Sequence, residues 1–170
     1  MPIAETNRLF ISKITLNDAK FFMDLVNSPN WLKYIGDRKV KTIKDAKSYL
    51  KNGTLKSYTD HGFGFYKLQH KETGKKPIGI CGLVKREQLE DVDIGFALLP
   101  EYEGKGFGYE ASVEILKLAK EKFNIDRIIA ITLPTNTSSI KLLEKLGLSF
   151  EKNINPFEEG KELLLFSKTL

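Results

Sequence analysis

Three glycines within five residues separate a strand-like segment from a helix-like segment, and this arrangement constrains the fold more than any other feature. They lie in Glu103–Gly108, after the apolar run Asp91–Leu99 and before a helical pattern that opens at Tyr109. Glycine lets backbone N–H groups approach an anion closely, and the following helix adds its positive N-terminus. Lys105 adds a full positive charge. The segment therefore predicts either a phosphate-binding loop or a tight turn that binds nothing.

Two common phosphate-binding motifs do not fit this loop. A P-loop requires Lys followed by Ser or Thr after the glycines, and the sequence has neither pair there. The segment Gly106–Ala111 matches the dinucleotide pattern G-x-G-x-x-A, but that motif needs an acidic residue after the next strand, where Thr132–Thr135 stands. It also requires serial parallel βαβ units, whereas most of the predicted β-structure precedes the loop as hairpins. We interpret the match as accidental.

The remaining pattern predicts strands and helices in mixed order. We expect strands at Arg8–Ile14, Gly64–Leu68, Pro77–Val84, Asp91–Leu99, Arg127–Leu133, around Phe150, and at Glu162–Lys168. We expect helices after a cap at Thr15 or Asn17, around Trp31–Ile35, from Thr42 to a stop at Gly53, from Tyr109 to about Phe123, and from Asn136 or Thr137 to Gly147. This order predicts an α/β (α+β) fold: a single mixed, mostly antiparallel sheet with helices on both faces.

Length and composition narrow the class of protein further. The 170 residues suggest one domain, and a chain of this length buries roughly 70% of its surface without help from disulfides or metals. The net charge of +5 is scattered along the chain, which suits an anionic small ligand or a weak nucleic-acid contact. The single cysteine, Cys81, excludes an internal disulfide and a cysteine-based metal site. With neither a signal-peptide pattern nor a long apolar run, we expect a soluble cytoplasmic protein.

Four segments of the chain form a recognisable series. They are Glu5–Leu9 with Thr15–Ala19, then Val92–Leu98, then Glu103–Ala111, and last Asn136–Gly147. In this order they resemble the N-terminal signature, the fourth strand, the pyrophosphate motif [QR]-x-x-G-x-[GA] and the N-x-x-S…K-x-G ending of the GNAT superfamily, the Gcn5-related N-acetyltransferases. The branch that the chain resembles includes the ribosomal-protein N-terminal acetyltransferases. The resemblance implies one GNAT-like acyl-CoA acyltransferase domain over residues 1–170.

The resemblance also implies an activity. A GNAT enzyme is an acetyl-CoA-dependent N-acetyltransferase that moves an acetyl group from the CoA thioester to a primary amine, by direct attack in a ternary complex. Acetyl-CoA would be the co-substrate, without a metal, and the partner would be a small-molecule amine or a protein N-terminus. We expect a monomer or homodimer, with no membrane contact and no specific nucleic-acid binding. The alternative is a non-catalytic acyl-CoA-binding or regulatory domain of the same fold.

The cofactor residues follow from the same resemblance. In GNAT enzymes the fourth strand carries a bulge and splays from the fifth, so that the pantetheine arm of CoA lies between them. The residues carried over are Gly104, Lys105, Gly106, Phe107, Gly108 and Tyr109 for the pyrophosphate, Phe96, Ala97 and Leu98 for the arm, and Asn136 and Ser139 for the other side of the cofactor.

The catalytic residues are more open. Asp93 stands where relatives carry an acidic general base, and it is either that base, a positioning group or an exposed strand carboxylate. Two positions depart from the family pattern: Glu103 replaces the usual Gln or Arg, and Leu143 replaces the tyrosine that protonates the leaving thiolate. Ser139 is the nearest matching hydroxyl and the second catalytic candidate.

Other chemically active side chains receive simpler interpretations. Trp31 and Tyr34 either line the pocket for the amine or belong to the core. His61 and His70 lack the spacing of metal ligands and are expected at the surface. Cys81 is expected to be a small buried hydrophobe rather than a nucleophile.

Overall fold

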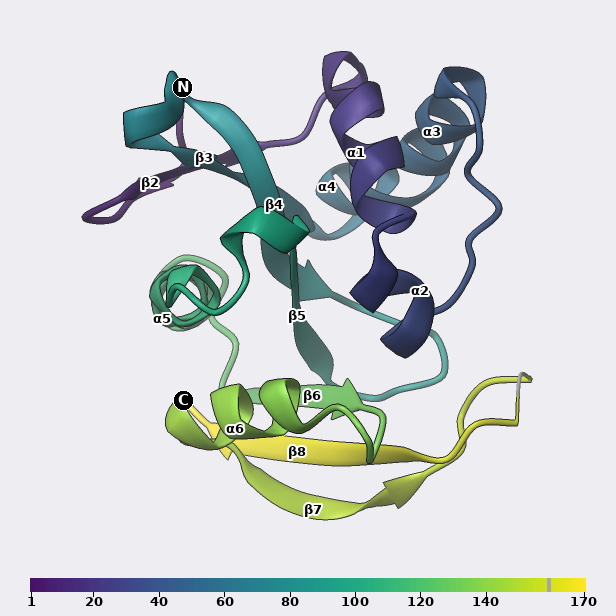
Figure 1. Ribbon diagram of the computed structural model, residues 1–170. Coiled ribbons are helices and arrows are strands. Elements are labelled where there is room, and N and C mark those ends of the chain that lie inside the picture. Colours follow the sequence, from purple (N-terminus) through teal and green to yellow (C-terminus); the bar gives the residue numbers. More distant parts are fainter. Residues whose placement is uncertain (159) are drawn as a thin grey trace.

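The computed structural model describes residues 1–158 and 160–170 and contains an eight-stranded sheet in the order β1-β2-β3-β4-β5-β6-β8-β7 (Figure 1). The strands are β1 (Ala4–Glu5), β2 (Leu9–Lys13), β3 (Phe65–His70), β4 (Lys76–Val84), β5 (Val92–Leu98), β6 (Arg127–Thr132), β7 (Ser149–Ile154) and β8 (Leu163–Thr169). Strands β5 and β6 pair in parallel, and the other neighbouring strands pair antiparallel. The predicted mixed, mostly antiparallel sheet is confirmed.

Six α-helices pack around this sheet. They are α1 (Ala19–Val26), α2 (Pro29–Tyr34), α3 (Ile43–Leu50), α4 (Lys56–His61), α5 (Phe107–Glu121) and α6 (Thr137–Lys145) among the described residues. The Thr15 side chain accepts a hydrogen bond from the backbone N–H of Asn17 and forms a capping box with Asp18, which confirms the cap at Thr15. Thr42 caps α3 in the same way through the N–H of Asp45. No described helix has the length and apolar character needed to cross a membrane.

The predicted helix stop at Gly53 is wrong. The chain continues from α3 through a π-helical turn, Lys51–Leu55, into α4. This helical segment ends instead at Gly62, whose φ of +80° is the left-handed conformation that glycine adopts without strain. The buried side chains of Leu50 and Thr54 hold the turn in place. Apart from its chain neighbours and the surrounding helical backbone, a Cβ at Gly53 would have no heavy atom within 4 Å. Glycine is therefore tolerated there inside a continuous helical segment.

Two hydrophobic cores lie on opposite sides of the central strands. The first joins α1, α2 and α3 to the face of β4 that carries Ile80. The second joins α5 and α6 to the opposite face, which carries Cys81 on β4 and Ile94 on β5. Because side chains alternate along a strand, Asp93 and Ala97 belong to the α1–α3 side, while Phe96 and Leu98 belong to the α5 side.

The sheet opens in its middle, between β5 and β6. The two strands pair at two positions only within the described chain, Val92 with Ile128 and Asp93 with Ile129, although β5 runs on to Leu98 and β6 to Thr132. Beyond Asp93 the strands diverge, as Figure 1 shows. The predicted splay is therefore present. The expected bulge is not seen in the β4–β5 register, which is continuous from Asp93 to Leu98.

Candidate active site

A cleft of about 2020 Å³ occupies the space between the diverging strands and the helices around them. It is lined by α2 and the loop after it, by α3, α4 and the turn between them, by β5 and the segment before it, by the glycine loop, the end of β6, the start of α6 and the loop before β8. Pockets for a single drug-sized ligand usually measure about 300–1,000 Å³. This cleft is large enough for two substrates at once.

The glycine loop ends in an uncapped helix N-terminus at one side of this cleft. Gly104 has φ +72° and Gly106 has φ +83°, so the chain turns there in a conformation that favours glycine. Gly106 is the N-cap of α5, which starts at Phe107, two residues earlier than the predicted start at Tyr109. No side chain caps this helix, so its first backbone N–H groups have no partner within the helix. The loop therefore presents free donors to an anion.

The N-terminal segment holds this loop in place. Glu110, on the first turn of α5, accepts hydrogen bonds from the Thr6 hydroxyl at 2.6 Å, the Arg8 backbone N–H at 2.9 Å and the Arg8 Nε at 2.8 Å. The Arg8 Nη1 donates to the carbonyl of Lys105 at 3.0 Å, and the guanidinium lies 4.0 Å above the Phe107 ring. Burial alone would raise the pKa of Glu110, but the hydrogen bonds from Thr6 and Arg8 lower it. We call Thr6, Arg8 and Glu110 the loop clamp.

The edge of β5 offers a second row of backbone groups. The N–H of Leu99 donates to the Ile78 carbonyl on β4 at 2.8 Å. Because successive N–H groups of a strand point to opposite sides, those of Phe96 and Leu98 point toward β6, which has moved away at this level. The predicted arm-binding residues Phe96, Ala97 and Leu98 thus lie where the sheet is open.

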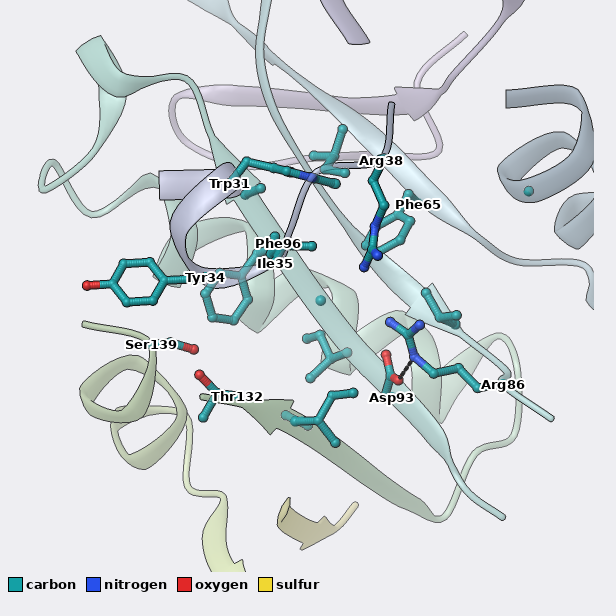
Figure 2. Close-up of a pocket in the computed structure, with 18 of the residues that line it drawn as sticks. Trp31, Tyr34, Ile35, Arg38, Phe65, Arg86, Asp93, Phe96, Thr132 and Ser139 are labelled. Carbon is teal, nitrogen blue, oxygen red and sulfur yellow. Dashed lines mark hydrogen bonds and ion pairs between the residues drawn. The ribbon is translucent and has the colours of Figure 1, made fainter. Parts of the chain in front are cut away.

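Asn136 and Ser139 lie at the start of α6, across the cleft from β5. Asn136 is the N-cap of α6: its Oδ1 accepts from the N–H of Ser139 at 3.2 Å, which leaves its amide NH₂ as a donor. The structure thus confirms that Asn136 caps this helix. Figure 2 shows the Ser139 hydroxyl facing the same region as that of Thr132, a residue at the end of β6 that the sequence analysis missed. Leu143, in the usual place of a tyrosine, is 1% exposed.

Asp93 is not an exposed strand carboxylate, because only 2% of its surface is accessible. Its Oδ2 accepts a hydrogen bond from the Nε of Arg86 at 2.6 Å (Figure 2). Burial raises the pKa of Asp93 above its ordinary value, and the ion pair with Arg86 opposes that rise. Asp91, by contrast, is one-third exposed and pairs with Arg127 on the outside of the sheet. Sequence reasoning missed Arg86, because nothing in its local pattern marks it as a cleft residue.

Trp31 and Tyr34 on α2 both line the cleft (Figure 2). Trp31 also belongs to the core, where it packs edge-on against Phe22, so its core placement is confirmed and its contact with the amine stays a prediction. Its Nε1 is buried and has no hydrogen-bond partner among the described residues. Phe65 and Arg38, which the sequence analysis did not single out, line the same wall.

The remaining expectations have mixed outcomes. Cys81 is buried beside Ser112, and burial raises its pKa to about 12, so it is the inert hydrophobe that we expected. Glu103 accepts a hydrogen bond from the side chain of Asn30. His70 is not a simple surface residue: it packs against Phe107 at 5.1 Å between ring centroids, and its Nδ1 is buried.

Comparison with known proteins agrees with this geometry. The family model described as an acetyltransferase (GNAT) domain matches residues 8–149. Over 161 residues the chain is 29% identical to p20 of Bacillus licheniformis, an uncharacterized N-acetyltransferase, covering 94% of this chain and 89% of that protein.

Two solved structures share the fold. The ribosomal L7/L12 alpha-N-protein acetyltransferase RimL, in complex with coenzyme A, aligns with a TM-score of 0.84 and 13% identity over 100% of this chain and 98% of its own. The microcin C7 self-immunity acetyltransferase MccE, in complex with acetyl-CoA and AMP, aligns with a TM-score of 0.80 and 17% identity over 96% of this chain and 93% of its own. The family model spans most of the sequence, and the fold matches from end to end. The chain therefore belongs to the GNAT acetyltransferase family.

Proposed function

We propose that this protein, as one domain of residues 1–170, is an acetyl-CoA-dependent N-acetyltransferase whose amine substrate attacks the thioester directly in a ternary complex. The observation that carries the proposal is that two sets of unpaired backbone donors border one cleft. One set is the uncapped N-terminus of α5, and the other is the β5 edge that β6 leaves open. A diphosphate and an amide-containing arm are the groups that such donors suit.

Each cofactor-side residue has a physical role in this proposal. The backbone N–H groups of residues 104–109 donate to the pyrophosphate, with Lys105 as a nearby cation. The N–H groups of Phe96 and Leu98 donate to the arm and to the thioester oxygen, while Ala97 holds the strand against β4. The free amide NH₂ of Asn136 and the hydroxyl of Ser139 complete the opposite wall.

Proton transfer is assigned to the side chains in the middle of the cleft. When bound, acetyl-CoA supplies an activated thioester whose thiol has a pKa near that of free cysteine, about 8.5, so its departure needs little assistance. Ser139, with Thr132 beside it in Figure 2, is the hydroxyl that we propose to hydrogen-bond to the leaving thiolate in place of the missing tyrosine, while the thiolate takes its proton from water. Asp93 lies on the α1–α3 side, about 10 Å along β5 from the open edge at Phe96, so we propose that it takes a proton from the amine through a chain of water molecules.

A non-catalytic acyl-CoA-binding domain is the second candidate. Two observations favour it. The buried apolar Leu143 stands where relatives carry the proton-donating tyrosine, and Asp93 already forms an ion pair with Arg86. Thioester consumption with a panel of amines separates the two functions. Amine-dependent release of free CoA is expected for the enzyme, and tight CoA binding without any turnover would favour the binding domain.

The loop assignment has its own test with a matched control. Gly106→Ala and Gly62→Ala both place a side chain at a positive φ, +83° and +80°, but Gly62, unlike Gly106, is not itself a lining residue of the cleft. The added backbone strain is therefore similar in the two variants. We expect the acetyl-CoA KM of Gly106→Ala to rise at least tenfold, about 1.4 kcal/mol, and that of Gly62→Ala to stay at the wild-type value. Equal KM values in the two variants would remove the loop from the cofactor site.

A further inference from the structure

Arg86 is fixed in one orientation inside the cleft. It follows β4, its Nε donates to the buried Asp93 at 2.6 Å, and its guanidinium lies 5.7 Å from the centre of the Phe157 ring. The side chain keeps 33% of its surface exposed, whereas Asp93 keeps 2%. In Figure 2 the terminal nitrogens of Arg86 face the side of the cleft that carries Phe65 and Arg38, and one of them is drawn beside the Asp93 carboxylate. An arginine held at its Nε presents a preorganised pair of donors at its other end.

These donors have no partner within the described chain. Arginine carries five N–H donors and no acceptor, and the bond to Asp93 accounts for one of them. Trp31 lines the same cleft with a second donor-only group, the buried Nε1 that lacks a hydrogen bond. Because the Trp31 Nε1 is closed to solvent, the donors open to a ligand are the terminal nitrogens of Arg86, and a hydrogen bond from such a charged group contributes about 1.5–3 kcal/mol. The wall therefore favours a ligand that brings acceptor oxygens, and a planar carboxylate matches the guanidinium fork.

The charges in the cleft disfavour a polycationic amine. A polyamine needs unpaired carboxylates, and Asp93, the one fully buried carboxylate among the described lining residues, is paired with Arg86. The other lining carboxylates are Asp45, Asp60, Glu87, Glu103 and Glu158, and these lie closer to solvent. Besides Arg86, the cationic side chains in the lining are those of Arg38, Lys39, Lys56, Lys85, Lys145 and Lys161, so cations outnumber the six carboxylates among the described lining residues.

We propose that the amine substrate also carries a carboxylate, which binds the terminal nitrogens of Arg86, and that Asp93 orients this arginine. The inference rests on the proposed function and specifies its substrate class. Arg86 is anchored at the level of Asp93, while the open β5 edge begins at Phe96, three residues further along the strand. At about 3.3 Å per residue this offset is roughly 10 Å, so the substrate separates its carboxylate from its amine by several bonds.

Binding is measured without turnover in the CoA-saturated protein. Trp31 is the single tryptophan of the chain, so its fluorescence reports ligands that enter this wall of the cleft. The probes are glycine, 4-aminobutanoate and 6-aminohexanoate, each titrated beside its carboxamide. We expect at least one of the two longer carboxylates to bind tenfold or more tightly than its carboxamide. Equal affinities across all pairs would overturn the proposal.

Variants assign the preference to Arg86. Arg86→Gln is expected to bring the carboxylate-to-carboxamide ratio down to about one, and Arg86→Lys, which keeps the charge but loses the fork, to leave a reduced preference. Arg127→Gln is the matched control, because Arg127 forms a similar ion pair with Asp91 outside the cleft, and it should keep the wild-type ratio. If Arg86→Gln does not fold because Asp93 is left unpaired, the double variant Arg86→Gln/Asp93→Asn removes both charges and carries the same expectation. A preference that survives there would refute the assignment.

Two further experiments ask whether the carboxylate belongs to a free amino acid or to a peptide, and whether a bound ligand is also acetylated. The affinity of the peptide amide Ala-Glu-Ala is compared with that of Ala-Gln-Ala. Tighter binding of Ala-Glu-Ala, together with weak binding of the three amino-acid probes, would identify an acidic peptide as the source of the carboxylate. Acetyl transfer to the same probes is measured separately. Carboxylate preference without transfer would contradict the proposed enzyme but support the anion site, whereas transfer without carboxylate preference would do the reverse.

Discussion

The loop clamp gives a prediction whose size follows from its contacts. In Glu110→Gln one carboxylate oxygen becomes an NH₂ group, so the acceptor is lost either for the bonds from the Thr6 hydroxyl and the Arg8 N–H to Oε2 or for the bond from the Arg8 Nε to Oε1, all now at 2.6–2.9 Å. Hydrogen bonds to a charged group contribute about 1.5–3 kcal/mol to the free energy of unfolding. Because Arg8 is partly exposed, we expect a loss in the lower half of this range, about 2 kcal/mol. For a chain of this length that corresponds to a Tm lower by about 4–8 °C.

The same variant should weaken the cofactor site. Arg8 holds the Lys105 carbonyl and covers Phe107, so a loosened clamp leaves the first N–H groups of α5 less well oriented. We expect the dissociation constant of CoA, measured by calorimetry below the transition temperature, to rise about tenfold. Asp24→Asn, which breaks the exposed Lys20–Asp24 pair, is the control and should change both quantities little.

The pH dependence of the free energy of unfolding tests the contribution of the Glu110 charge. The folded-state pKa of Glu110 is lowered, so its contribution is fully present above the ordinary glutamate pKa near 4.3 and is lost as the pH falls through the lowered value. The difference in unfolding free energy between wild type and Glu110→Gln should therefore be constant at neutral pH and shrink below about pH 4. A difference that does not change down to pH 2, or unchanged CoA affinity in Glu110→Gln, would refute the clamp.

Three further predictions concern other parts of the molecule. Asp93→Asn should lower kcat about 10²-fold at pH 7 with a deficit that shrinks as the pH rises and free amine accumulates, whereas a pH-independent deficit in the rate profile would mean that Asp93 only positions Arg86. Gly82→Ala should destabilise the fold by about 3 kcal/mol in denaturant unfolding, because its new Cβ would lie 2.2 Å from the Gly64 carbonyl, while Gly53→Ala, with open space around it, should stabilise by about 0.5–1 kcal/mol. Cys81, whose thiol pKa is raised to about 12 by burial, should react with Ellman's reagent only after unfolding, and rapid native labelling would contradict its burial.

Local signals in the sequence predicted much of the site's framework. The glycines of Glu103–Gly108 indicated a turn that only glycine adopts easily, and Gly104 and Gly106 do have positive φ. The polar residue before the last long helix indicated a cap, and Asn136 provides it. Apolar runs marked most of the strands to within one or two positions, but the two-residue strand β1 (Ala4–Glu5) was not predicted. In each case the cause lies within a few residues of its effect.

Contacts between distant residues could not be predicted in this way. The loop clamp joins Arg8 to Glu110, 102 residues apart, and becomes visible only when β2 and α5 pack together. Arg86 lies seven residues from Asp93, but their pairing depends on how the chain turns after β4. Gly53 misled the prediction for a related reason: glycine often ends a helix, and only the packing of Leu50 and Thr54 decides that this one does not.

The most direct test of the account is a crystal structure of the protein with acetyl-CoA. We expect pyrophosphate oxygens within hydrogen-bond distance of the N–H groups at the start of α5, and the pantetheine arm between β5 and β6 on the N–H groups of Phe96 and Leu98. We also expect the thioester to face the part of the cleft lined by Asp93 and Trp31. Acetyl-CoA bound outside the β5–β6 opening, or with its pyrophosphate away from the glycine loop, would contradict these expectations.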